Sequence, residues 1–371
     1  MKLAILITNP NHHLELSLGV AKIAKAAGDE VKYISLCELR RMQSPVDTFM
    51  EEGLDFIKFS DLPQQLKPSS GKKSLGKSDS KLRILVQTAF WLLKLRPFIK
   101  SAFRGADKVL LMNDGAFPGN KICAWLKKKK IPFYLLQEGI RFPLPNQSEG
   151  KYGGAGAEKV LTWGKRSANH FREIVADHTR VVVAGSPRFD NFLRQVEEAA
   201  VIPNETRRLG IFTNPIDDLG FCSKDEKLKI FEHFIRRSAD YLNSNEIVVS
   251  IKCHPREDVD EYMEIGTRYL NHIMKSPTNI FDAIMEVEAG VIMASTVGLE
   301  LMGAGKCVAQ LEIPGYGYVF DYTDDERVIK VPAEGDFELV SLFEDMVDLT
   351  YFHEHVAKGR SSEKVYKHIK G

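Results

Sequence analysis

Short apolar runs rich in β-branched residues alternate with longer amphipathic stretches along the chain. The first such unit has a strand at 3–8, a helix at 14–27 that ends at Gly28, and a strand at 30–35. Strand, helix and strand in this order form a βαβ unit, so we predict a parallel sheet. The same pattern predicts later strands at 107–112, 132–136, 158–162 and 180–184.

A second alternation follows a stretch at 199–207, which we interpret as an interdomain linker. Its strands are predicted to begin at residues 209, 247 and 289. We therefore expect an α/β protein with two facing, doubly wound, Rossmann-like domains and a cleft between them. The expected boundaries are 1–200 for the first domain, 201–345 for the second, and 346–371 for a helical tail that packs back on the first.

The composition is typical of a soluble globular protein of two or three domains, with 44% of the 371 residues hydrophobic and 27% charged. The 51 lysines and arginines balance 50 aspartates and glutamates, so the net charge of +1 gives no argument for a nucleic-acid partner. Five scattered cysteines without a CxxC pair argue for a reducing compartment and against zinc. We find neither a signal peptide nor a membrane span, and expect a cytoplasmic protein.

One segment differs from the rest in composition. Proline, glycine, lysine and serine gather at 60–81, which predicts a mobile loop. A basic, aromatic segment at 82–104 follows, and Pro97 is expected to kink its helix. Such a segment can lie on an anionic membrane surface, or it can be a helix that packs on the core. Both interpretations stay open, and the first would make 67–104 a peripheral membrane contact.

Polar residues follow the strand that begins at residue 247. His254 ends this strand, because Pro255 lacks an N–H and disfavours helical geometry in the residue before it. The acidic residues that follow suit a helix that starts close to the proline. Ligands bind at the carboxyl ends of strands in such sheets, and a helix N-terminus favours an anion. Lys252, Pro255 and Arg256 are therefore candidate donor-binding residues beside His254, unless this is an ordinary surface turn.

A second helix N-terminus is predicted after the strand at 289–294. Ser295 is a good N-cap, and Thr296 places a second hydroxyl beside it. Paired hydroxyls at a helix N-terminus suit a phosphate, and Glu300 could accept hydrogen bonds from ribose hydroxyls. The structural alternative is that Ser295 only caps the helix and Glu300 only faces solvent. On the functional interpretation these residues and His254 line one nucleotide pocket.

The first domain also carries polar residues at predicted strand ends. Asn11 and His12 lie in the loop after the first strand, and Asp114 follows the strand at 107–112. Glu138 follows the strand at 132–136 in a glycine turn. Each could face an acceptor substrate at the carboxyl edge of the sheet, or be an ordinary exposed turn residue.

The turn at 185–190 carries one more candidate. Ser186 as N-cap and Pro187 at the first helical position explain the turn structurally, which leaves Arg188 for donor binding or for a local ion pair. No metal site is predicted. His12 and His13 lack a Cys or His partner at metal spacing, and the two carboxylates of 258–260 point to different helix faces.

Together these motifs resemble those of the GT-B glycosyltransferases of bacterial surface polysaccharides. Gln137–Gly139 resembles their acidic D/E-D/E-G motif, and His254–Pro255 resembles their HP motif. Ser295–Thr296 with Glu300 resembles their hydroxyl-pair helix, and Gly185–Asp190 is similar to their G-x-P-R-x-D segment. The group includes capsule-type 3-deoxy-manno-octulosonic acid (Kdo) transferases, sialyl- and polysialyltransferases, and CDP-glycerol glycerophosphotransferases. The resemblance covers about residues 107–310.

The resemblance implies a metal-independent glycosyltransferase without a cofactor. It would move an acidic sugar, such as Kdo or sialic acid, from a CMP-linked donor to a surface glycan or lipid-linked acceptor. Glu138 would be the base for the acceptor hydroxyl, and His254 would stabilise the leaving phosphate. Gln137 stands where the motif has an acid, which leaves Glu138 as the motif carboxylate. A nucleotide-sugar 2-epimerase of the same fold and a non-catalytic polysaccharide-assembly subunit stay open as alternatives.

Overall fold

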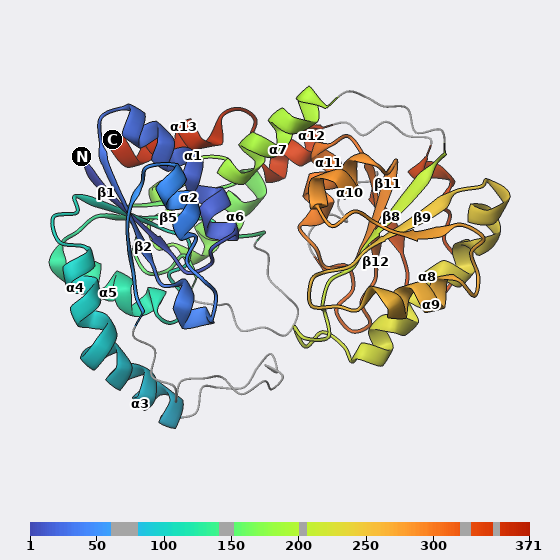
Figure 1. The fold of residues 1–371 in the computed structure, drawn as a ribbon, viewed down its shortest axis with the longest axis horizontal. Helices are drawn as coiled ribbons and strands as arrows, with labels where there is room; N and C mark the ends of the chain where they lie inside the picture. Colours follow the sequence, from blue (N-terminus) through green and yellow to red (C-terminus); the bar gives the residue numbers. More distant parts are fainter. Residues whose placement is uncertain (61–80, 141–151, 200–205, 320–327, 344–348) are drawn as a thin grey trace.

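The computed structural model describes residues 1–60, 81–140, 152–199, 206–319, 328–343 and 349–371. Within them the chain forms two parallel β-sheets with helices packed on their faces, as Figure 1 shows. The predicted α/β class with two sheets in series is confirmed. Almost all of the loop expected at 60–81, and most of the linker expected at 199–207, lie outside the described residues.

The first sheet has seven strands in the order β3-β2-β1-β4-β5-β6-β7, and every neighbouring pair is parallel. The order reverses between β1 and β4, which makes this the topological switch point where such sheets bind ligands. The strands are β1 (Lys2–Ile7), β2 (Glu30–Ser35), β3 (Asp55–Lys58), β4 (Lys108–Leu111), β5 (Phe133–Leu136), β6 (Lys159–Thr162) and β7 (Val181–Val183).

The second sheet has six strands in the order β10-β9-β8-β11-β12-β13, again all parallel. Its order reverses between β8 and β11. The strands are β8 (Arg208–Phe212), β9 (Val248–Lys252), β10 (Ile273–Lys275), β11 (Ala289–Ile292), β12 (Cys307–Leu311) and β13 (Val328–Val331).

Helices follow most of the strands along the chain; among the described residues none lies between β5 and β6 or between β12 and β13, and the last two helices come after the last strand. Those of the first half are α1 (His12–Ala26), α2 (Val46–Glu51), α3 (Lys81–Phe90), α4 (Arg96–Ala102), α5 (Gly119–Lys129), α6 (Lys165–Ile174) and α7 (Pro187–Glu198). Those of the second half are α8 (Lys224–Ser244), α9 (Val259–Gly266), α10 (Ile280–Met285), α11 (Val297–Gly303), α12 (Thr350–His355) and α13 (Ser361–Lys370). Short 3₁₀ turns lie at Cys37–Arg40, His178–Arg180 and Val340–Leu342.

Near Pro97, where the sequence predicts a kink, the helical pattern changes. A π-helical turn at Trp91–Leu95 joins α3 to α4, and Phe90, Leu95 and Arg96 all have right-handed helical dihedral angles. Pro97 follows this wider turn directly, so the hydrogen bond that proline cannot donate is lost where the helical ladder already changes. One face of the segment packs on the core through Trp91, Leu95 and Ile99. The core-facing interpretation is therefore correct for that face.

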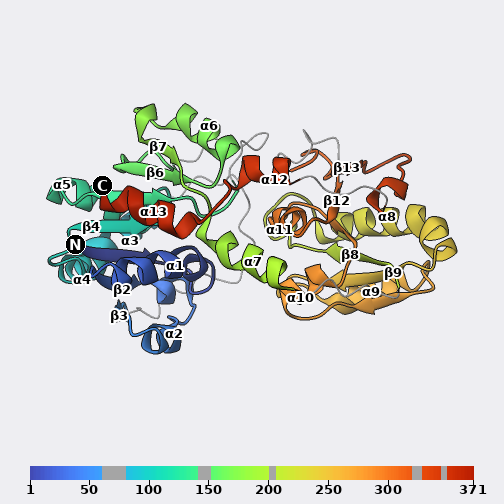
Figure 2. The ribbon, with the colours of Figure 1, turned by 90° about the horizontal axis from the view of Figure 1, so that it is seen from above.

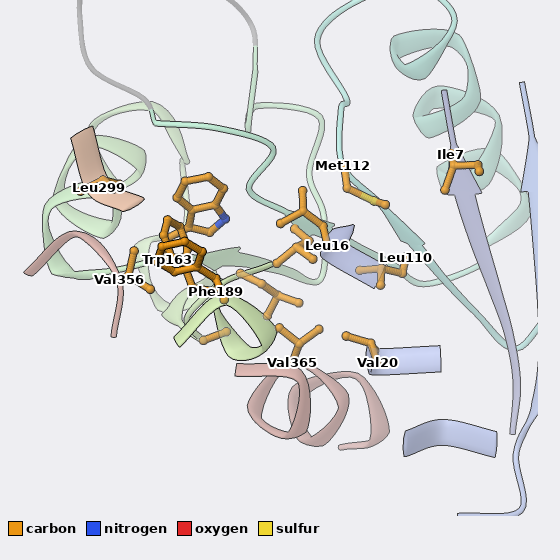
Figure 3. Close-up of a cluster of buried hydrophobic side chains, with 14 of the residues drawn as sticks. Ile7, Leu16, Val20, Leu110, Met112, Trp163, Phe189, Leu299, Val356 and Val365 are labelled. Atoms are coloured by element: carbon orange, nitrogen blue, oxygen red, sulfur yellow. The ribbon is translucent and has the colours of Figure 1, made fainter. Parts of the chain in front are cut away.

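One hydrophobic cluster runs through both halves of the molecule. Val20 of α1 and Val365 of α13 belong to it, and Figure 3 shows them with the other members around Trp163 and Phe189. The rings of Trp163 and Phe189 meet edge to face with centroids 6.1 Å apart. Leu299 of α11, which follows a strand of the second sheet, lies in the same cluster. The two sheets are therefore joined by shared apolar packing.

The last helix, α13, returns to the first domain and packs along α1, as Figure 2 shows. Asp190 on α7 accepts hydrogen bonds from the N–H groups of Ser361 and Ser362 at 2.8 and 2.7 Å. These bonds satisfy two donors that the first turn of α13 leaves without helical partners.

Asp29 holds the other end of α13. It accepts the N-terminal amino group of Met1 at 2.9 Å, the Lys370 amine at 2.5 Å and the Tyr366 hydroxyl at 2.8 Å. Burial disfavours the charged carboxylate, but these hydrogen bonds outweigh burial and lower the pKa of Asp29 to about 2. The two ends of the described chain are therefore fixed at one carboxylate.

Replacing Asp29 with Asn should lower the free energy of unfolding by about 1–3 kcal/mol at neutral pH, as for loss of a hydrogen bond to a charged group. The folded chain holds the pKa of Asp29 below its unfolded value, so the stabilisation is present above the unfolded pKa and is lost as the pH falls toward 2. Urea unfolding of both proteins across this pH range measures the difference. Glu30→Gln, which removes an exposed ion pair with Lys2, is the control and should change little. Equal losses from both variants would contradict the role of Asp29.

Candidate functional site

The loops after β1, β4 and β5 meet at the switch point of the first sheet. His12 and His13 begin α1, Asn113 follows β4, and Glu138 follows β5. Since β1 pairs with β4 and β4 pairs with β5, all parallel, these side chains reach one edge of the sheet. The structure thus brings together His12 and Glu138, which the sequence predicted as site residues, and adds His13 and Asn113.

Both carboxylate oxygens of Glu138 accept hydrogen bonds. His13 Nε2 lies 3.0 Å from Oε1, and the Asn113 amide donates to Oε2 at 2.8 Å. The main-chain N–H of Thr8 donates to His13 Nδ1 at 3.2 Å, so Nε2 carries the ring proton. Burial disfavours the charge on Glu138, but the bonds from His13 and Asn113 outweigh burial and lower its pKa to about 2. The carboxylate is therefore ionised at neutral pH, and both of its oxygens already accept hydrogen bonds.

His12 is bonded to the backbone of the same loop. Its Nε2 makes a hydrogen bond with the main-chain carbonyl of Glu138. A carbonyl oxygen only accepts, so Nε2 carries the proton and Nδ1 keeps its lone pair. Burial lowers the pKa of His12 and the charge of Arg188 adds to this, against the hydrogen bond that His12 donates to the Glu138 carbonyl, which raises it. The ring is therefore neutral at pH 7, with Nδ1 as a proton acceptor.

The other two residues expected on the acceptor side, Asp114 and Asn11, make local contacts of their own. Asp114 is buried, and its carboxylate accepts the main-chain N–H groups of Gly153 and Ala155 at 2.7 and 3.0 Å. Asp114 therefore anchors the loop before β6, and its predicted acceptor contact stays a prediction. Asn11 is exposed at the start of α1, and its main-chain N–H donates to the Asn9 side chain at 3.1 Å.

His254 lies two residues beyond the end of β9. The helix expected to start close to Pro255 starts later, because a turn intervenes and α9 begins at Val259 with Asp258 as its N-cap. In this turn the N–H of Arg256 donates to His254 Nδ1 at 3.2 Å, so Nε2 carries the proton and is a donor. Burial and the charge of Arg256 lower the pKa of His254. This ring, too, is neutral at pH 7.

A buried network supports the His254 turn from behind. The main-chain N–H of His254 donates to the Thr213 hydroxyl at 3.4 Å, and that hydroxyl donates to Glu257 at 2.7 Å. Glu257 also accepts from the Lys227 amine and the Tyr262 hydroxyl, both at 2.7 Å. The side chains of Lys227 and Glu257 are each only 4% exposed, so each charge depends on its partner. No member of this network was assigned to the site from the sequence.

The helix predicted after β11 begins slightly later than expected. Thr296, not Ser295, is the N-cap residue of α11, and the Ser295 hydroxyl accepts the first helical N–H at 3.3 Å. Asn214, after β8, donates to the carbonyl of Ala294 at 2.6 Å and ties the two loops together. Because β8 lies between β9 and β11, His254 and Ser295 follow strands about 10 Å apart at one edge of the sheet.

Arg188 joins the two sheet edges. It lies in the first turn of α7, and its guanidinium contacts Glu15 of α1 at 3.3 Å and Glu300 of α11. Glu300 is 4% exposed, and its second oxygen has no hydrogen-bond partner in the described part of the chain. Burial raises the pKa of both Glu300 and Glu15, while Arg188 opposes the rise. One cation therefore faces two carboxylates, one from each domain.

Arg188 and Glu300 were both predicted to bind the donor, and the structure pairs them with each other. Glu300 is buried, so its alternative of facing solvent is wrong, whereas the ribose contact expected of it stays a prediction. Lys252 and Arg256 also have local partners, the Thr278 carbonyl at 2.6 Å and Asp218 at 3.2 Å. These two cations are at the surface, and such exposed contacts are readily exchanged.

Two hollows are found among the described residues. A small cavity lies at the first edge, lined in part by Thr8, His13, Arg40 and Asn113. A second hollow, of about 340 Å³, is lined by Lys165, Arg166, Asn169 and Glu354. In the part of the chain that the structure describes, no three His, Cys, Asp or Glu side chains are placed to hold a metal ion. The described helices include none that is long and apolar enough to cross a membrane.

Replacing Arg188 with Met should leave the Glu300 carboxyl buried without its cation. Removing one partner of a buried pair costs about 3–5 kcal/mol, and urea unfolding should show a loss of this size. Glu300→Gln in the same chain should recover part of it. Arg194→Met, on the same helix but in an exposed pair with Glu198, is the control and should change stability little. If Arg188→Met behaves like Arg194→Met, the pair does not hold the domains together.

No protein-family model and no curated protein sequence matches the chain. Solved structures match over its whole length. The UDP-GlcNAc 2-epimerase of Methanocaldococcus jannaschii is 12% identical with a TM-score of 0.61, covering 100% of this chain and 99% of that chain. CalG4, the calicheamicin glycosyltransferase, is 13% identical with a TM-score of 0.52, covering 100% and 93%. Anabaena Alr3699/HepE, solved with UDP and glucose, is 12% identical with a TM-score of 0.51, covering 100% and 95%.

Identities this low establish the fold and leave the activity open. The solved structures that share the fold include a glycosyltransferase and a nucleotide-sugar epimerase. Both sheets of this chain are parallel, each has a single switch point, and the likenesses extend across both. The chain therefore has the two-domain, Rossmann-like GT-B fold.

Proposed function

We propose that the chain is a glycosyltransferase that moves a sugar from a nucleotide donor to a glycan or lipid-linked acceptor. The observation that carries this proposal is the pair of strand-end clusters joined through Arg188. One cluster holds a neutral histidine with a free lone pair, His12, and the other holds a neutral histidine that donates, His254. Sugar transfer needs a base for the acceptor hydroxyl and a donor for the leaving phosphate.

The donor site lies in the second domain. In our proposal His254 Nε2–H points at the donor phosphate, and Ser295 and Thr296 bind the same phosphate at the start of α11. Lys252 and Arg256, next to His254, exchange their exposed partners for the nucleotide. From the motif resemblance we propose a CMP-linked acidic sugar, such as Kdo or sialic acid. Solved structures of this fold carry UDP, so the nucleobase of the donor is the part of the proposal that most needs a test.

On the acceptor side the geometry favours His12 over Glu138 as the group that takes the proton. Both Glu138 oxygens already accept hydrogen bonds, and a carboxyl whose pKa is about 2 is a weak base. His12 Nδ1 has a lone pair that no hydrogen bond reaches among the described residues. Glu138 then acts as a positioning residue, since its carbonyl fixes the tautomer of His12 and its charge favours the imidazolium that forms.

The reaction we propose is a displacement with inversion. The acceptor oxygen attacks the anomeric carbon while the bond from that carbon to the phosphate oxygen breaks. The acceptor proton passes to His12 Nδ1, and the electron pair of the broken bond stays on the phosphate, where His254 donates a hydrogen bond. Protein groups fill both roles, so the proposal includes no metal and no cofactor.

We place this activity in the cytoplasm, at the inner face of the membrane if the acceptor is lipid-linked. A nucleotide-sugar 2-epimerase of the same fold is the competing enzyme, and product analysis separates the two. An epimerase converts the nucleotide sugar without an acceptor, whereas a transferase releases nucleotide only when an acceptor is added. A non-catalytic assembly subunit would do neither.

A thermal-shift series with CMP, CDP, UDP and GDP tests the donor. Bound nucleotide stabilises the folded chain by about 2.7 kcal/mol at 100 times its dissociation constant, so the melting temperature should rise most with CMP. His254→Ala should reduce the shift, because it removes a donor to the phosphate. A selective response to UDP would overturn the cytidine assignment and leave the nucleotide site intact. No response to any nucleotide would overturn the donor site.

Rates of transfer distinguish the two candidate bases. His12→Ala should lower kcat by about 10²- to 10⁴-fold and leave the nucleotide-induced thermal shift unchanged. Because burial lowers the pKa of His12, the wild-type rate should rise with pH below 6.5, where His12 loses its proton, and then level off. This rise is the acid limb of the pH profile.

Glu138→Gln keeps the main-chain carbonyl and removes the charge that favours the imidazolium. The limb should therefore move to lower pH, with a smaller loss of kcat than His12→Ala gives. If Glu138→Gln abolishes the limb and costs as much as His12→Ala, Glu138 is the base, as the sequence suggested.

A further inference from the structure

Exposed apolar side chains gather on one helical segment. Among the described residues, Leu85, Val86, Leu92 and Leu93 are 65%, 43%, 49% and 75% exposed, and all four lie on α3 and the π-helical turn that follows it. The other large exposed hydrophobic side chains are scattered over separate elements. Single exposed apolar residues are ordinary, whereas a contiguous patch marks an interaction site.

The four residues share one side of a continuous helix. Leu92 follows Leu85 by seven residues, and Leu93 follows Val86 by seven, which is about two helical turns. Phe90, Trp91 and Leu95 of the same segment are buried in the core. The helix is therefore apolar on two sides, one against the domain and one toward solvent. Figure 1 shows α3 reaching outward at the lower edge of the first domain.

The charge of this segment is one-sided. From Lys81 to Ala106 the sequence has six lysines and arginines and no aspartate or glutamate, although the whole chain is nearly neutral. Arg96, Lys100 and Arg104 are exposed on α4 and just beyond it. A second copy of this face would bring like charges together, which disfavours self-association. An anionic bilayer offers both an apolar interior and negative headgroups.

We propose that the exposed side of α3, the π-helical turn and α4 is a docking surface for an anionic lipid bilayer. Leu85, Val86, Leu92 and Leu93 enter the boundary between headgroups and acyl chains, and the basic residues contact the headgroups. The segment lies on the membrane, because no described helix is long and apolar enough to cross it.

The docked helix is close to the proposed acceptor side. The ring of Phe90, at the end of α3, lies 6.5 Å from that of Phe117, in the loop after β4. The same loop carries Asn113, which binds Glu138. Docking would therefore bring the acceptor edge of the first sheet toward the lipid surface. This orientation rests on the proposed function, whereas lipid binding itself does not.

Co-sedimentation of the purified full chain with vesicles tests the proposal without any nucleotide or acceptor. Phosphatidylcholine vesicles with added phosphatidylglycerol should sediment the chain, and pure phosphatidylcholine vesicles should do so far less. Raising the salt concentration should weaken binding, since salt screens the headgroup charge. Arg96→Glu with Lys100→Glu should lower the partition coefficient at least about 25-fold, because each basic residue near the surface contributes about fivefold.

Leu93→Glu tests the apolar part and should also reduce binding. Its matched control is Met50→Glu, on α2, where the side chain is 68% exposed. The control for charge is Arg236→Glu with Arg237→Glu, an exposed pair on α8 of the other domain. Unchanged melting temperatures show that each variant folds.

Absent binding to anionic vesicles would overturn the proposal, and so would equal losses from the variants and their controls. Self-association that Leu93→Glu abolishes, seen by light scattering without lipid, would assign the surface to a second copy instead. A failed nucleotide response leaves these outcomes untouched, so the failure of lipid docking and the failure of the transferase proposal can be told apart.

Discussion

One guanidinium between two carboxylates links the two domains beside the apolar cluster that they share. Arg188 has Glu15 on one side and Glu300 on the other, and Glu300 is almost fully buried. A buried carboxylate is tolerated only when a cation or hydrogen bonds compensate for the lost water. Among the described residues the second oxygen of Glu300 has no hydrogen-bond partner, so this compensation is incomplete there. The pair therefore fixes the position of α11 against α1 while leaving a polar atom that a ligand hydroxyl could satisfy.

Main-chain hydrogen bonds set the chemistry of the histidines at both sheet edges. The Glu138 carbonyl fixes the proton of His12 on Nε2, and the N–H groups of Thr8 and Arg256 do the same for His13 and His254. Each ring thus presents a defined donor or acceptor to its other neighbour. Burial lowers the pKa of His12 and of His254, so both rings are neutral near pH 7. His12 can then accept a proton and His254 can donate a hydrogen bond.

Much of the fold follows from the sequence, because strands buried on both faces are continuous apolar runs. The strands that were not separately predicted are partly exposed or interrupted. β3, β10 and β13 lie at the edges of the sheets and carry exposed residues, so they do not form continuous apolar runs. Within β12, the buried Gln310 breaks the apolar run, and its amide donates to the carbonyl of Met293 at 3.3 Å.

The strand-end positions of Glu138 and His254 could be predicted for the same reason, but their partners could not. Glu300 and Arg188 are 112 residues apart, and no local pattern indicates that they meet. From the sequence, Lys227 would be placed on the exposed face of a helix. It is buried because Asp217 and Glu257 accept hydrogen bonds from its amine. The tautomers of the histidines depend on backbone groups from other loops, which sequence periodicity does not encode.

Because α13 packs on α1, the parts of the first domain are separated in the sequence and are synthesised at different times. During synthesis every strand of the second sheet is made before the helix that completes the hydrophobic cluster around Val20. Until then the apolar side of α1 that α13 will cover is open to solvent or to other chains. The packing of the first domain is therefore completed last, although most of that domain is made first. Asp29 lacks its Lys370 partner until a further 341 residues have been made.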